Sequence, residues 1–178
     1  SVLKLTAQLY PLKEGESMAT YLDFDFGSGW TNVASADVVY PGWFSQYRIE
    51  NWDNTQDVAY RVRHKAKAIY NESIYQGLIR HDPVEKDTVV MATLGCIGKN
   101  YQDDKVEMVA AIQDEDPDVI FFYGDQYYVN YQHSAAWLEF GRWAKELFRN
   151  RPAMVIMDDH DYSFGNLWGA GGVEAPSR

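Results

Sequence analysis

The 178-residue chain has one cysteine, few basic residues and no long apolar run, and each shortage excludes a class of protein. Cys96 has no second cysteine for an internal disulfide, so the sequence leaves the redox compartment open. Sixteen Lys and Arg against 26 Asp and Glu give a net charge of −10. This argues against nucleic acid as a partner, because phosphate contacts need clustered basic side chains. No apolar run approaches the ~20 residues that a membrane-spanning helix needs.

Residues 1–87 have the pattern of short strands separated by turns. "FDFGSGW" (24–30) and "YPGW" (40–43) are typical turn sequences. "YRIENW" (47–52) and "YRVRH" (60–64) alternate apolar and polar residues, as half-buried strands do, and "IYQGLIRHDP" (74–83) predicts a further strand that stops at Pro83. We therefore predict an aromatic-rich, β-sandwich-like N-terminal module over residues 1–87.

From residue 88 the pattern changes to continuous apolar strands that alternate with helical patterns. Strands are predicted over 88–95, 118–125 and 153–161, the first two buried on both faces. The first intervening helix has helical spacing at Val106, Val109, Ala110 and Gln113, and the second has Ser134 as its N-cap. The apolar stripe of the second helix comprises Trp137, Phe140, Ala144, Leu147 and Phe148. This order predicts parallel pairing with right-handed crossovers, and hence a two-part α+β chain whose residues 88–178 form the first βαβαβ portion of an α/β domain.

Ligand-type side chains follow each of the three predicted parallel strands. The carboxyl ends of such strands lie along one rim of the sheet, where ligands usually bind. Gly124 allows a sharp exit from the second strand, so that Asp125 can point into a pocket shared by all three. The rim residues are Cys96, then Asp125 and Tyr128, then Asp158, Asp159, His160 and Asp161.

Such a rim favours cations. Carboxylates in one pocket repel one another and stay ionised only if cations neutralise them. A thiolate, a phenolate, an imidazole and carboxylates together suit one softer transition metal and one or more hard cations. A carboxylate that bridges two metals is the usual device of two-metal phosphoryl transfer.

Each rim residue also has a purely structural alternative. A lone Cys is more often a small buried hydrophobe, Gly-Asp is a common turn pair, and "DDH" could cap a helix. Asn100 could contact metal or phosphate or lie in a solvated loop, and Asn166 could line the pocket from the glycine-rich stretch 163–172, which lacks the Walker spacing. For the other histidines we expect surface or packing roles: His64, His81 and His133.

"GDQYY" (124–128) after one buried strand and "MDDHDYSFGNLWG" (157–169) after the next resemble the alkaline phosphatase D (PhoD-like) family of calcineurin-like metallophosphoesterases. "YRIENW" and "YQGLIRHDP" resemble the β-rich module that precedes the catalytic domain in that family, so the likeness covers most of the chain. It implies iron and calcium ions that act on phosphate esters, other divalent metals being possible. The sequence around Cys96, "LGCIGKN", departs from the serine-cysteine form of the best-known members.

Matched motif by motif, the resemblance implies roles for five of the rim residues. Cys96 and Tyr128 would ligate iron, and Asp125 would bridge the metals. Asp159 would hold the second metal, and His160 would contact the phosphoryl group or protonate the leaving oxygen. The family also needs histidine ligands beyond His160, and this sequence has none there. We therefore expect residues 88–178 to be the first half of the catalytic domain, inactive alone, with further ligands from a C-terminal segment or a partner chain.

Two hypotheses thus stand at the level of sequence. The first is metal-dependent hydrolysis of phosphate esters, for which the family resemblance also implies export to the periplasm or the extracellular space. The second is a non-catalytic binding or assembly protein whose aromatic-rich β-module binds a glycan or a partner chain.

Overall fold

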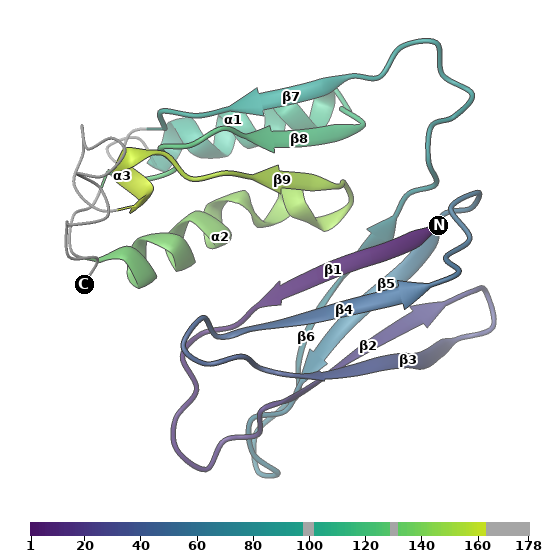
Figure 1. The fold of residues 1–178 in the computed structure, drawn as a ribbon, viewed down its shortest axis with the longest axis vertical. Coiled ribbons are helices and arrows are strands. Elements are labelled where there is room, and N and C mark those ends of the chain that lie inside the picture. The colour runs from purple at the N-terminus through teal and green to yellow at the C-terminus, as the bar shows by residue number, and fades with distance from the viewer. Residues whose placement is uncertain (98–101, 129–131, 163–178) are drawn as a thin grey trace. The chain divides into compact units, whose positions relative to one another are not determined.

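The chain is an α+β protein with mostly antiparallel strands (Figure 1). The structure, a computed structural model, describes residues 1–97, 102–128 and 132–162. It divides into two compact units, Ser1–Asp82 and Pro83–Arg178. No helix in the described part of the chain combines the length and apolar character needed to cross a membrane.

The first unit consists of two antiparallel sheets. One sheet pairs β1 (Val2–Gln8) with β4 (Phe44–Glu50) along their whole lengths. The other has the order β3-β2-β5-β6, built from Trp30–Asp37, Ala19–Asp25, Val58–His64 and Ser73–Ile79. The strands predicted over 47–52, 60–64 and 74–83 correspond to β4, β5 and β6.

A single apolar core joins the two sheets of the first unit. Leu22 and Phe24 of β2 are buried with Tyr47 of β4, and Leu3 and Leu5 of β1 pack against this cluster. The alternation of side chains along each strand sends every second residue into this layer. The Tyr47 hydroxyl also donates a hydrogen bond of 2.6 Å to Thr20 Oγ1 of the facing sheet. The unit is therefore sandwich-like, with its core between the sheets.

The second unit contains a three-stranded sheet with the order β7-β8-β9 (Figure 1). Its strands are Met91–Leu94, Val119–Phe122 and Ala153–Val155, and both pairs are parallel, which confirms the predicted pairing. The helix α1 (Gln102–Asp114) connects β7 to β8, and α2 (His133–Arg149) connects β8 to β9. A short helix, α3 (Asp159–Tyr162), follows β9.

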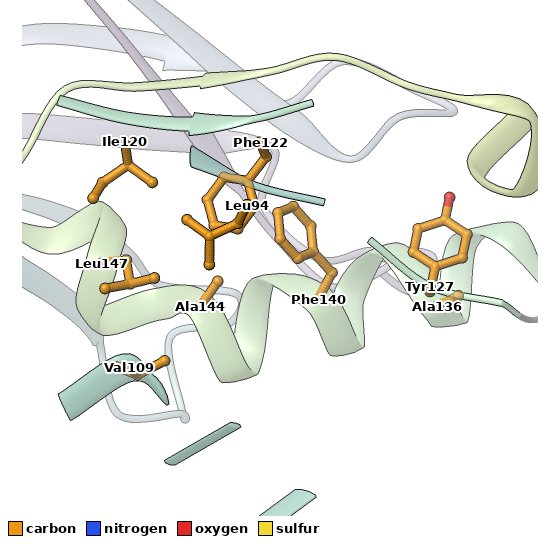
Figure 2. Packing of buried hydrophobic residues seen from close by; sticks show 9 residues of the cluster. All are labelled: Leu94, Val109, Ile120, Phe122, Tyr127, Ala136, Phe140, Ala144 and Leu147. Atoms are coloured by element: carbon orange, nitrogen blue, oxygen red, sulfur yellow. The ribbon is translucent and has the colours of Figure 1, made fainter. Parts of the chain in front are cut away.

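The core of the second unit lies between the sheet and its helices. Ile120 and Phe122 of β8 are fully buried, and Figure 2 shows them with Leu94 on the side of the sheet that faces α2. The Phe140 ring of α2 packs edge to face on the Phe122 ring, with 4.9 Å between the ring centroids. The predicted stripe of α2 is confirmed at its centre, where Phe140, Ala144 and Leu147 are buried, and Trp137 and Phe148 pack against them.

Several sequence predictions for this unit are wrong in detail. The sequence predicts two strands buried on both faces, but α1 and α2 pack on the same core, and Met91 on the other face of the first of these strands is 48% exposed. Met154 of β9, for which the sequence makes no such prediction, is 49% exposed. Ser134 is not the N-cap of α2, which begins at His133 after Gln132. The helix predicted around Val106 and Val109 forms as α1, in which Val109 is buried and Val106 is exposed. The third strand ends at Val155, and "DHD" enters α3.

Candidate metal centre

The three segments that follow the carboxyl ends of β7, β8 and β9 are joined by backbone hydrogen bonds. The backbone N–H of Cys96 donates to Gly124 O (3.1 Å), and that of Ile97 donates to Asp125 O (2.9 Å). On the other side, the Ile156 N–H donates to Phe122 O (2.9 Å). The ladder therefore carries the residues that follow each strand to a common rim, as parallel pairing requires.

Asp125 is the centre of this rim. Its side chain accepts a hydrogen bond from the Tyr128 hydroxyl at Oδ2 (3.0 Å) and from the His160 backbone N–H at Oδ1 (3.3 Å). The Cys96 thiol lies 3.9 Å from the same Oδ2. Asp125 is only 7% exposed, so this carboxylate is held in place from three chain segments.

Asp125, Asp159 and His160 form a group that could hold a cation. Each offers one ligand atom, and these atoms lie within 4.8 Å of one another. The His160 imidazole also lies against the Tyr128 ring, with 4.3 Å between ring centroids. Cys96 lies outside this group, but its thiol and the Tyr128 hydroxyl both contact Asp125 Oδ2, so a cation near this oxygen would have a thiol and a phenol among its neighbours.

Burial shapes the protonation of the two tyrosines that follow Asp125. It raises the pKa of Tyr128, and the neighbouring Asp125 and Cys96 raise it further, so the phenol stays protonated unless a cation displaces its proton. Burial also raises the pKa of Tyr127, whose hydroxyl donates to the Asp161 carbonyl (3.1 Å) and pairs with His133 Nδ1 (2.6 Å). Tyr127 thus connects the β8 exit to α2 and α3.

Asp161 has a structural role that the sequence did not reveal. The pattern placed it at the rim without a role, yet its carboxylate is 1% exposed and accepts the backbone N–H groups of Asp125 (2.6 Å), Gln126 (2.9 Å) and Asp158 (3.2 Å). Burial raises its pKa, and these N–H donors act in the opposite direction. An acidic residue three positions after a helix N-cap was the available signal, because such a residue often reaches back to the cap N–H.

The backbone at the rim adopts conformations that few residues tolerate. Cys96 and Asp125 have φ of 53° and 54°, and Gly124 has φ of 117°. A Cβ at Gly124 would lie 2.5 Å from the Asp158 Cβ and 3.0 Å from its backbone N. Glycine is therefore required at 124 both for its φ and for the close approach of the segment after β9.

We expect Gly124→Ala to lower the free energy of unfolding by about 2 kcal/mol, through an unfavourable φ and the clash with Asp158. Gly141→Ala in α2 is the matched control, since a Cβ there meets nothing within 4 Å and alanine is the better helix former, by up to ~1 kcal/mol. Thermal denaturation of both variants measures the contrast. A Gly124→Ala variant as stable as the wild type, or more stable, would contradict the packing described.

The remaining sequence candidates are distributed as follows. Asn100 and Asn166 lie outside the described residues. His64 Nε2 pairs with Ser17 O (2.7 Å), and His81 Nδ1 pairs with Asp57 Oδ1 (2.7 Å), both in the first unit. The structure therefore brings together five predicted residues: Cys96, Asp125, Tyr128, Asp159 and His160.

No protein-family model matches this chain, and no curated protein matches it in sequence. The geometry of the rim is therefore the basis for assigning a function.

Proposed function

We propose that the chain supplies part of the active site of a metal-dependent phosphoric ester hydrolase, of the alkaline phosphatase and phosphodiesterase type found in the PhoD-like metallophosphoesterases. The observation that carries the proposal is the convergence of ligand-type side chains on Asp125 from the exits of three consecutive parallel strands. A single strand end with an acidic turn would not support it. Three ends that meet at one buried carboxylate do, because parallel sheets bind ligands at this edge.

The donor set fits the cations that the family resemblance implies. Cys96, Tyr128 and Asp125 offer sulfur and oxygen donors around one carboxylate oxygen, a set suited to iron. Asp125 and Asp159 offer hard oxygen donors suited to calcium, and His160 provides a nitrogen donor that other divalent metals accept. Cations bound there would supply charge neutralisation and Lewis acidity for phosphoryl transfer.

The residues of the chain would then have separate tasks. Asp125 would bridge two cations because its two oxygens face different neighbours, Tyr128 on one side and the His160 backbone on the other. The His160 side chain, stacked on Tyr128, would contact the phosphoryl group or hand a proton to the leaving oxygen. Without cations the carboxylates of this rim would repel a phosphate ester, and bound cations would supply the positive charge that offsets this repulsion.

The site that these residues form would be completed by other ligands. The group in the described residues holds one histidine and two aspartates. We propose that the remaining histidine ligands come from a C-terminal segment or from a partner chain, and that residues 1–178 alone hydrolyse phosphate esters poorly or not at all.

Binding of Mn²⁺ to residues 1–178 tests the proposal at its first step. Mn²⁺ accepts carboxylate and imidazole donors and broadens the NMR signals of nearby nuclei. We expect the amide signals of Asp125, Asp159 and His160 to broaden most strongly. Uniform broadening, or none at millimolar Mn²⁺, would refute the cation site and with it the proposed function.

One observation favours the second candidate, a binding function of the β-module. A cleft of about 240 Å³ lies in the first unit, with aromatic and apolar walls and polar groups among its lining residues, which are Phe24, Phe26, Val33, Ile49, Asn51, Trp52, Asp53 and Gln56. A chain that binds no cation at the rim would leave this as the better proposal.

A further inference from the structure

We propose that Asp161 is a positioning residue, which fixes the backbone of the β8 exit against α3 and so sets where the Asp125 carboxylate and the α3 ligands meet. Its predicted effect on cation binding rests on the function proposed above. Its effect on the backbone does not, and the two can be measured separately.

The contacts of Asp161 join the two segments that carry the ligand group. Oδ2 accepts the N–H groups of Asp125 (2.6 Å) and Asp158 (3.2 Å), and Oδ1 accepts that of Gln126 (2.9 Å). The Asp161 carbonyl accepts the Tyr127 hydroxyl (3.1 Å). Through this one residue α3 therefore binds three successive residues of the β8 exit.

Helix capping alone does not account for this arrangement. The bond to the Asp158 N–H is the local half of a capping box. The bonds to Asp125 and Gln126 cross 36 and 35 positions of sequence, and they hold a stretch whose first residue has φ of 54°. A side chain that served only the cap could face solvent, whereas Asp161 is 1% exposed.

The number of acceptors identifies the variant to make. The carboxylate presents two acceptor oxygens to three N–H donors, and an amide of the same size presents one oxygen and an NH₂ group. In Asp161→Asn at least one N–H of Asp125, Gln126 or Asp158 must therefore face another donor. Glu146→Gln is the matched control, because Glu146 pairs with Arg149 (2.7 Å) in the last turn of α2, in the same unit but not at the rim.

Amide hydrogen exchange without metal, followed by Mn²⁺ titration, tests the proposal. In the wild-type chain we expect the Asp125 and Gln126 amides to exchange slowly. Asp161→Asn should speed their exchange by about tenfold or more and weaken Mn²⁺ binding by about 10- to 100-fold, the usual effect of losing a group that orients metal ligands. Glu146→Gln should change neither quantity by more than about twofold.

The outcomes separate the two proposals. Fast exchange of the Asp125 and Gln126 amides in the wild type would show that Asp161 does not hold the backbone of the β8 exit. This measurement needs no variant, so it decides even if Asp161→Asn does not fold. Faster exchange in Asp161→Asn with unchanged Mn²⁺ affinity overturns the positioning role. If the wild-type chain binds no Mn²⁺, the function proposed above fails. Amide exchange alone then decides whether Asp161 holds the backbone of the β8 exit.

Discussion

Replacement of Asp125 by asparagine is expected to reduce phosphate ester hydrolysis by about 100-fold or more in an active preparation and to lower its metal content. The carboxylate is contacted from the exits of all three parallel strands. An amide carries no charge and only one oxygen, so it can neither neutralise two cations nor bridge them. Size and hydrogen-bond acceptance on one side are preserved, which limits the structural damage.

Hydrolysis of p-nitrophenyl phosphate and bis(p-nitrophenyl) phosphate, with iron and calcium content by mass spectrometry, measures this effect. Asp57→Asn is the matched control, because Asp57 is a half-exposed carboxylate paired with His81 in the first unit, where the same change should alter neither quantity. Full activity and metal content in Asp125→Asn would exclude the bridging role and the proposed reaction with it.

The rim could be anticipated from the sequence because it depends on topology more than on packing. Continuous apolar strands separated by helical patterns require parallel pairing, and parallel strands place the residues after each carboxyl end together. Cys96, Asp125 and His160 therefore lie close together, as the parallel strand order predicts, although "DHD" forms the start of α3 and not the end of a strand. The separation into a β-module and an α/β part follows from the same change in period.

Other features could not be read from local pattern. The exposed face at Met91 and Met154 is as apolar as a buried one, and only the placement of both helices on one side decides between them. Asp161 resembles its neighbours Asp158 and Asp159 in sequence, and its burial follows from N–H groups that lie 35 and 36 residues earlier in the chain. Ser134 is not the N-cap of α2, because the helix begins one residue before it.

The second large effect concerns Asp23, which lies on the face of the four-stranded sheet away from the core. It is 1% exposed, and its carboxylate accepts hydrogen bonds from Arg61 Nε (2.7 Å), Arg63 Nε (2.6 Å) and Asn32 Nδ2 (3.0 Å). Trp30 covers the Arg61 guanidinium at 4.7 Å, which helps to exclude water. Removal of one member of such a network leaves the others without their countercharge.

Asp23→Ala is therefore expected to lower the free energy of unfolding at pH 7 by about 3–5 kcal/mol. Urea denaturation, followed by tryptophan fluorescence, measures it. Glu50→Ala is the matched control in the same unit, since the Arg48–Glu50 pair is more than half exposed on both sides and should contribute less than about 1 kcal/mol. Equal effects of the two substitutions would mean that the Asp23 network is no stronger than a surface pair.

The same network predicts a pH dependence. Burial by itself would raise the pKa of Asp23, but the hydrogen bonds from Arg63, Asn32 and Arg61 outweigh it and lower the pKa from 3.8 to about 2. Because the folded pKa is the lower one, the stabilisation is fully present above about pH 4 and is lost as the pH falls towards 2. The loss amounts to about 2 kcal/mol. The wild type should therefore lose this much more stability than Asp23→Asn between pH 5 and pH 2, and parallel curves for the two proteins would show that the carboxylate is not held ionised by its arginines.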